Sequence, residues 1–242
     1  MNPALLVSKT GLQAQEAKLQ VIAHNLANVN TAGFRADFKR ASAYALTGDG
    51  YQSRVMAREE QAGTDFRAGA LMQTGRKLDV AIRGDGFLTV QTADGKEAYT
   101  RAGNLEVDGE GLLTLNGRPV LGDGGEMVLP AYRDLSFGKD GSLSITPPGG
   151  GARLDVGRLK LVNPDPADLV KGADGLFRQR QGGDAEISEQ VVLASGFLEG
   201  ANVNAVDELI SSMSLTRNFE LQVKLMQSVD AQAQQGNELI SG

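Results

Sequence analysis

The chain has 242 residues, of which 41% are hydrophobic, and this length is sufficient for one or two domains with hydrophobic cores. Its formal net charge of −6 disfavours nucleic-acid binding, because neutralising phosphates requires a basic surface. It contains no cysteine and one histidine, so disulfides and thiolate metal sites are excluded, and we expect neither a metal nor a cofactor.

A long amphipathic helix is predicted at the start of the chain, over residues 2–28. Asn2 suits the position that caps a helix, and Pro3 suits the first helical position. Leucines recur every seven residues and form one apolar stripe together with an isoleucine: Leu5, Leu12, Leu19, Ile22 and Leu26. The positions between the leucines are partly polar, so the stripe favours packing in a larger helical assembly over an isolated dimer.

The middle of the chain has a different pattern. Residues 35–75 lack a clear period and are expected to form an extended linker. Over residues 76–200, Asp-Gly pairs recur, and these are typical of hairpin turns because both residues tolerate positive φ. Short apolar or alternating runs between the turns predict an antiparallel, β-rich domain. These runs cover residues 78–82, 87–92, 112–115, 143–145 and 154–162.

A second long helix is predicted within residues 201–242. Asn204 suits its N-cap, and Asp207 complements the amides of the first turn. Its apolar side is formed by Val206, Leu209, Met213, Phe219, Val223 and Met226. A helix of this length reaches about 50 Å and needs a neighbour, so we expect it to pair with the first helix.

The predicted fold is therefore α+β. Long terminal helices are expected to pair in a coiled-coil-like layer, with a central antiparallel all-β domain between them in the sequence. The expected segments are a first helix with its turn, a linker, a β-rich domain and a last helix, over residues 1–34, 35–75, 76–200 and 201–242.

A specific motif follows this pattern. Residues 19–35 read Leu-Gln-Val-Ile-Ala-His-Asn-Leu-Ala-Asn-Val-Asn-Thr-Ala-Gly-Phe-Arg and resemble the N-terminal signature of the flagellar rod and hook protein family. Residues 74–87, 99–104 and 200–209 resemble further motifs of that family. The resemblance implies a signature turn, formed by Asn25, Asn28, Asn30, Thr31, Gly33 and Phe34. Thr-Arg-Ala-Gly at 100–103 resembles the proximal-rod members, since distal-rod members usually have Asp where Ala102 stands.

This resemblance implies a structural subunit rather than an enzyme. It would assemble with copies of itself and with other rod proteins into a hollow helical shaft of the flagellar basal body, which spans the periplasm and transmits torque. The terminal helices would form an inner layer and the β domain an outer one. The resemblance also implies export by the flagellar type III apparatus. We expect no cleaved signal peptide and no transmembrane segment, because the matching apolar patterns are missing from the sequence.

Three alternatives remain open at the level of sequence. The chain could be a distal-rod paralogue, or a secreted β-domain binding module that oligomerises through its helical ends. A hydrolase acting on cell-wall glycans would need paired carboxylates, for which Asp79 and Asp85 are candidates. No motif around these two residues supports a catalytic role, and we expect no small-molecule substrate.

Overall fold

The computed structural model describes residues 3–39, 41–45, 55–59 and 63–241, and the chain divides into two compact units. The helical unit comprises Met1–Asn28, Ala36–Asp65 and Val203–Gly242. The β unit comprises Val29–Arg35 and Phe66–Asn202. The chain therefore passes from one unit to the other at four points, after residues 28, 35, 65 and 202.

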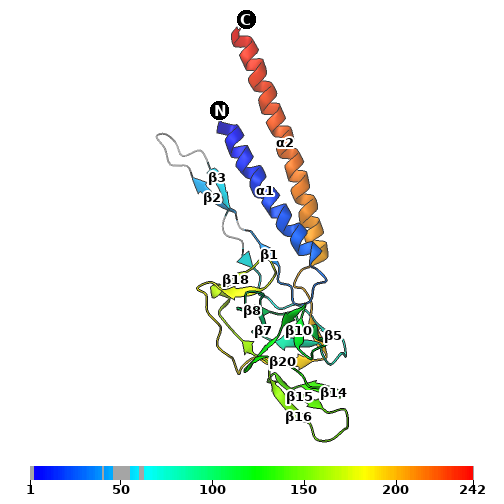
Figure 1. Cartoon of the computed structure of the whole chain (residues 1–242). Coiled ribbons are helices and arrows are strands. Elements are labelled where there is room, and N and C mark those ends of the chain that lie inside the picture. Colours follow the sequence, from blue (N-terminus) through cyan, green and yellow to red (C-terminus); the bar gives the residue numbers. More distant parts are fainter. Residues whose placement is uncertain (1–2, 40, 46–54, 60–62, 242) are drawn as a thin grey trace. The chain divides into compact units, whose positions relative to one another are not determined.

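Two long antiparallel helices form the main part of the helical unit: α1 (Pro3–Ala27) and α2 (Ala205–Ser241). They lie side by side, with α2 the longer of the two (Figure 1). Asn25 near the end of α1 bonds to Glu208 near the start of α2, and Gly11 faces Gln222 further along α2. Because the end of α1 meets the start of α2, and earlier residues of α1 meet later residues of α2, the two helices run antiparallel. Neither helix, within the residues described, contains a stretch apolar enough to cross a membrane.

The helical unit also contains two short antiparallel strand pairs. Strand β1 (Asp37–Phe38) pairs with β4 (Gly63–Thr64), and β2 (Ala41–Ala45) pairs with β3 (Val55–Glu59). These strands lie within residues 35–75, which are expected from the sequence to form a linker. The division of the chain places residues 36–65 in the helical unit and residues 66–75 in the β unit. The sequence contains no sign of β1, because this strand is held by hydrogen bonds between its backbone and Asn25 of α1. Such bonds require no regular spacing of apolar residues.

The β unit consists of short strands whose pairs are all antiparallel. A five-stranded sheet has the order β17 (Leu161–Val162), β7 (Phe87–Gln91), β8 (Glu97–Thr100), β19 (Phe177–Gln179) and β18 (Leu169–Lys171). Two three-stranded sheets are formed by β11 (Arg118–Pro119), β10 (Leu113–Leu115) and β9 (Leu105–Val107), and by β14 (Asp134–Phe137), β15 (Ser142–Thr146) and β16 (Leu154–Arg158). The two-stranded pairs are β12 (Leu121–Gly122) with β13 (Gly125–Glu126), β20 (Val192–Ser195) with β6 (Val80–Arg83), and β21 (Phe197–Glu199) with β5 (Leu71–Gln73). A 3-10 turn, η1 (Pro166–Asp168), precedes β18.

Asp-Gly turns connect several of these strands, as the sequence predicts. Gly95 and Gly141 have φ of +77° and +83°, a region that favours glycine, and each follows an aspartate. The carboxylate of Asp140 accepts hydrogen bonds from the amide and hydroxyl of Ser142, at 3.2 and 2.7 Å. Such local bonds close the turn and set the register of the two strands that it joins.

The core of the β unit has two parts. The larger part packs aliphatic residues from several sheets, including Val80, Leu105 and Leu143, all fully buried. The smaller part is aromatic: the rings of Phe87 and Phe177 lie 5.5 Å apart between their centroids. Because β7 contributes to both parts, its two faces are buried, and the turn that precedes it is held in a fixed place.

Candidate functional site

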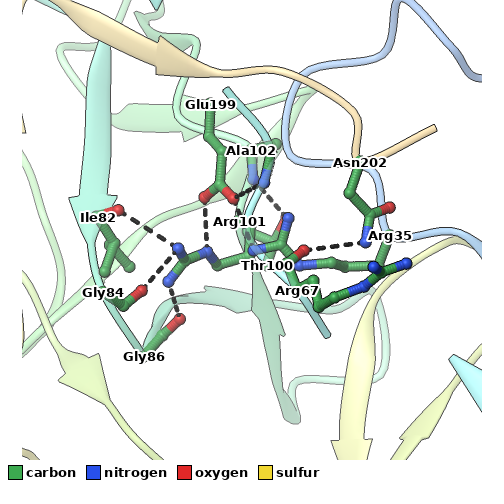
Figure 2. Close-up of polar contacts among 11 residues, drawn as sticks. Arg35, Arg67, Ile82, Gly84, Gly86, Thr100, Arg101, Ala102, Glu199 and Asn202 are labelled. Atoms are coloured by element: carbon green, nitrogen blue, oxygen red, sulfur yellow. Dashed lines mark hydrogen bonds and ion pairs between the residues drawn. The ribbon is translucent and has the colours of Figure 1, made fainter. Parts of the chain in front are cut away.

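Three charged side chains from distant parts of the sequence meet inside the β unit (Figure 2). Glu199, at the end of β21, accepts hydrogen bonds from Arg101 Nε through Oε2 and from Arg35 Nη2 through Oε1, both at 2.7 Å. The exposed fractions of the Glu199, Arg101 and Arg35 side chains are 0%, 3% and 2%. We call these three residues the charge cluster. Removing one member of a buried ion pair typically costs about 3–5 kcal/mol.

Arg101 also binds the turn between β6 and β7. Its Nη1 donates to the carbonyl oxygen of Gly86 at 2.6 Å, and its Nη2 donates to those of Gly84 at 2.8 Å and Ile82 at 3.3 Å (Figure 2). Burial lowers the pKa of Arg101, and the Glu199 carboxylate opposes this shift. An arginine stays protonated in proteins, so Arg101 links three carbonyl groups to Glu199 as a cation.

Further hydrogen bonds attach the segment at residues 67–69 to the cluster and join the segments that carry Arg35 and Glu199. Glu199 accepts a bond from the amide of Gly69 through Oε1 at 2.8 Å, and one from the amide of Gly33 through its carbonyl oxygen at 2.7 Å. Asn202 donates from its amide to Phe34 at 3.3 Å and from its side chain to Arg67 at 2.9 Å. The segments that adjoin three of the four crossing points are therefore fixed to the β unit at one place.

The close approach of these segments requires glycine at two positions. A Cβ on Gly33 would lie 2.2 Å from the backbone of Arg101 and Ala102, and Gly33 also has φ of +69°. A Cβ on Gly103 would lie 1.7 Å from the carbonyl oxygen of Val80. No side chain fits at these distances, so the backbones can meet only through glycine.

Lys171 of β18 covers the outer end of this region. Its ammonium group lies 4.1 Å from the centroid of the Phe34 ring and donates to the carbonyl oxygen of Arg35 at 2.7 Å. A cation over an aromatic face is attracted by the ring, and here it also satisfies a backbone acceptor.

The segments that meet at the charge cluster resemble parts of known proteins. Three family profiles match the chain: "Flagella basal body rod protein" over residues 5–35, "Flagellar hook protein FlgE/F/G D1 domain" over 81–145 and "Flagellar basal body rod FlgEFG protein C-terminal" over 194–239. Each matched segment contributes one member of the charge cluster, Arg35, Arg101 and Glu199 in turn.

Relatives match over almost the whole length. The flagellar basal-body rod protein FlgF of Escherichia coli (strain K12) is 39% identical over 229 residues, covering 91% of both chains. FlgF of Salmonella typhimurium (strain LT2) is 38% identical with the same coverage. This chain belongs to the flagellar basal-body rod proteins. Its relatives also include the rod protein FlgG of Buchnera aphidicola from Schizaphis graminum, 32% identical over 99% of this chain and 100% of the relative. The chain is a structural rod subunit of the FlgF type, as its motif at 100–103 predicts.

The signature turn of this rod protein is shared between the two units. In the helical unit, the Asn25 amide donates to the Asp37 carbonyl and to Glu208 Oε1, and accepts from the Asp37 amide, each at 2.9 Å. Asn25 is 3% exposed, so all its polar groups are satisfied inside the protein. Asn28 donates to the carbonyl oxygen of His24 at 2.9 Å, and the His24 ring lies 3.2 Å from the Asp37 carboxylate. These bonds fix the end of α1.

The remaining signature residues lie in the β unit. Gly33 and Phe34 are buried, whereas Asn30 and Thr31 are exposed. Only the second half of the signature therefore contributes to the charge cluster, and its first half joins α1 to α2 and β1.

The predicted apolar stripes of the rod protein have unequal exposure. Ile22 is 5% exposed, whereas Val206, Leu209 and Met213 are 62%, 48% and 72% exposed. Leu12, Leu26, Val223 and Met226 are half-buried, Leu19 and Phe219 are exposed, and the Leu5 side chain lies outside the described residues. The partly covered side of α2 instead follows a three-and-four spacing: Ala205, Glu208, Ser212, Leu215, Gln222 and Met226. The predicted stripe of α2 thus remains largely accessible in the single chain.

The carboxylates considered for a glycan hydrolase lie in different surroundings. Asp79 is 4% exposed and accepts a hydrogen bond from Arg76 at 2.9 Å, whereas Asp85 is exposed within the turn that Arg101 binds. Among the residues that the structure describes, no group of three or more His, Asp or Glu could hold a metal ion.

The charge cluster is the feature that sequence reasoning missed. One signal was available: each of its members stands beside small or apolar residues, as in Thr-Arg-Ala-Gly at 100–103 and Phe-Arg at 34–35. Arginine and glutamate are almost never fully buried unless they are paired. Charged residues inside apolar family motifs could thus have been predicted to pair, although not with which partner.

Proposed function

We propose that this rod protein assembles with copies of itself and with other rod proteins into the hollow proximal rod, and that it transmits torque within the basal body that spans the periplasm. The FlgF relatives support this position, as does Ala102, which replaces the Asp usual in distal-rod members. A distal-rod role is the alternative, supported by the FlgG relatives.

The terminal helices would form the inner layer of the rod, and the β unit the outer layer. The exposed surface of α2 includes seven large hydrophobic residues along its length: Val206, Leu209, Ile210, Met213, Phe219, Leu221 and Leu225. Burying such a side chain fully contributes about 1.5–3 kcal/mol. Neighbouring subunits that cover this stripe would therefore supply the free energy of assembly, together with the exposed Leu19 of α1.

The observation that carries the torque proposal is the charge cluster. The chain crosses between the two units at four points, and these crossings would carry a twisting load from one unit to the other. Glu199 holds Arg35 and the Gly69 amide, and Asn202 holds Phe34 and Arg67, so the crossings after residues 35, 65 and 202 are anchored on the β unit. A buried and mutually bonded anchor resists local opening better than single surface contacts.

Export would use the flagellar type III apparatus without cleavage of a signal peptide. A chain without cysteine cannot form disulfides when it enters an oxidising compartment. We also propose that the protein has no enzymatic activity, because its relatives are rod proteins and Asp79 is engaged in a structural ion pair.

Deletion of the gene in its source bacterium tests this function, with soft-agar motility and electron microscopy of isolated basal bodies as readouts. We expect non-motile cells whose basal bodies end within the proximal rod, and restoration by the intact gene. Basal bodies that keep a proximal rod and stop in the distal rod would support the FlgG-like alternative. Motile cells with complete flagella would contradict a rod function.

A further inference from the structure

The turn between β10 and β11 carries an Asn-Gly pair, Asn116 and Gly117. Asn116 is the one asparagine in the sequence that is followed by glycine. Both residues are exposed, and a Cβ built on Gly117 would meet no atom within 4 Å. Because glycine has no Cβ, nothing hinders the Gly117 nitrogen from attacking a neighbouring side-chain amide. The pair is therefore a candidate for a spontaneous intramolecular reaction.

The folded turn holds the two reacting groups apart. Asn116 and Gly117 have φ of +51° and +76°, and two positive φ values in a two-residue loop are typical of a type I′ turn. In this turn ψ of the first residue is about +30°, since type I′ is the mirror image of type I. The Gly117 nitrogen then lies nearly opposite Asn116 Cβ about the Cα–C bond. Closing a five-membered ring requires these two atoms to be nearly eclipsed.

Neighbouring contacts keep the turn in this conformation. Nδ2 of Asn104 donates to Oδ1 of Asn116 at 3.1 Å, which restrains the side chain. Leu115 of β10 pairs with Arg118 of β11, and the Leu113 and Leu115 side chains are 0% and 1% exposed in the core. Rotation about ψ of Asn116 therefore requires the hairpin to open, and the reaction depends on how often this local opening occurs.

We propose that Asn116 is a site of spontaneous deamidation, and that the folded β10–β11 hairpin suppresses the reaction. When the hairpin opens, the Gly117 nitrogen loses its proton to solvent and attacks Cγ of Asn116. The new N–Cγ bond replaces the bond to the side-chain NH2 group, which takes up a proton and leaves as ammonia. Water then hydrolyses the cyclic imide. Cleavage of the N–Cγ bond gives aspartate, and cleavage of the original peptide bond gives isoaspartate.

The two products have different effects on the hairpin. Aspartate leaves the backbone unchanged, its carboxylate can still accept the hydrogen bond from Asn104, and Asp-Gly also suits a type I′ turn. Isoaspartate inserts a methylene carbon into the main chain at residue 116. Since loop length and turn type fix the register of a hairpin, the longer loop no longer matches the pairing of Leu115 with Arg118.

The first test follows deamidation of the purified full chain in mildly alkaline buffer, with and without guanidinium chloride, by peptide mapping and mass spectrometry. We expect Asn116 to react at least about tenfold faster in denaturant, because the hairpin is then open. Asn104, which Leu105 follows, is the internal control and should react at least about tenfold more slowly than Asn116 in denaturant. Equal rates at these two asparagines would overturn the assigned site. A rate at Asn116 that denaturant does not change would overturn its protection by the fold.

Gly117→Ala tests the attacking atom. It is studied in denaturant, where the positive φ of residue 117 has no influence. The added Cβ hinders the nitrogen, so Asn116 should deamidate at least about tenfold more slowly than in the wild type. An unchanged rate would overturn attack by the Gly117 nitrogen.

Asn116→Asp separates the effect of charge from that of backbone length. Wild-type chains are deamidated in denaturant and refolded, and their isoaspartate content is measured by enzymatic methylation. In the isoaspartate fraction, the amides of β10 should exchange with solvent at least about tenfold faster than in Asn116→Asp, which should match the untreated wild type. Equal exchange in the isoaspartate fraction and in Asn116→Asp would overturn the predicted loss of register.

Discussion

Glu199 is the carboxylate that opposes two buried arginines, and it bonds to three other segments of the β unit. Its side chain meets Arg101, Arg35 and the Gly69 amide, and its carbonyl oxygen meets the Gly33 amide. Such a residue cannot be replaced without leaving charge unpaired inside the protein. A side chain of the same shape without the charge, such as glutamine, therefore cannot replace Glu199.

Glu199→Gln should destabilise the β unit by about 3–5 kcal/mol, because two guanidinium groups would remain buried without a counter-charge. Urea unfolding followed by fluorescence of the tyrosines measures the change. Glu126→Gln, at an exposed position of β13, serves as the control and should change stability by less than about 0.5 kcal/mol. Equal stability of the two variants would show that the cluster does not hold the unit together.

A second residue-scale prediction concerns pH. Hydrogen bonds from Arg178 at 2.7 and 3.0 Å lower the pKa of Asp174, while partial burial opposes the shift. Because the folded pKa lies below the unfolded value of about 3.9, this pair stabilises the fold above that pH and is lost as pH falls through the folded pKa.

Asp174→Asn should therefore lower stability at pH 7 and should have no further effect well below pH 3. The expected loss is only about 0.5 kcal/mol, because both side chains are partly exposed to solvent. Thermal unfolding of the wild type and the variant between pH 2 and pH 7 measures it. A difference that grows toward acid would contradict the assigned sign.

At the scale of elements, periodicity indicates where both helices lie but locates only some of the strands. The first helix is expected over 2–28 and spans Pro3–Ala27, and the run at 87–92 contains β7. Strands β1 to β4 had no such signal, and β1 is held by two hydrogen bonds between Asn25 and the backbone of Asp37 rather than by an apolar face. The charge cluster was also hidden, because Arg101 and Glu199 are 98 residues apart in the sequence.

Some apolar residues of the two helices are exposed and others are buried, and paired variants can separate the roles of the two groups. Met213→Asp changes a residue that is 72% exposed, so the folded monomer should be unaffected within about 0.5 kcal/mol. In the assembled rod the same charge would be buried against a neighbour, and incorporation should fail. Leu19→Asp on α1, at 38% exposure, should behave in the same way.

Ile22→Asp is the contrasting variant, because Ile22 is 5% exposed within the helical unit. It should reduce helix content in the free monomer, as measured by circular dichroism, and it should also block assembly. Incorporation of Met213→Asp into basal bodies at the wild-type level would mean that the outer stripe of α2 is not an assembly surface.

At the scale of the whole molecule, the two units differ in how much they bury. In the described part of the helical unit, Ala17 and Ile22 are the buried hydrophobic residues, whereas the β unit has two extended clusters. Helices with little buried surface are marginal in water, so most of the stability of the free subunit should reside in the β unit.

Amide hydrogen exchange on the monomer checks this distribution. We expect residues 10–27 and 205–228 to exchange within seconds to minutes, and β7 and β8 to remain protected for much longer. In isolated basal bodies the helices should become protected as well, because assembly couples ordering to binding. Strong protection of both helices in the monomer would show that they are ordered before assembly.

The long separation of the contacting residues has a consequence for incomplete chains. Asn25 bonds to Glu208 across 183 positions, and Arg101 bonds to Glu199 across 98. A chain that stops before residue 199 lacks the carboxylate that pairs with the two buried arginines, and it also lacks the second helix. Neither unit can then close, so truncated products would stay unfolded and remain open to proteases. We therefore expect that only chains containing both partners of these long-range contacts fold and are incorporated into the rod.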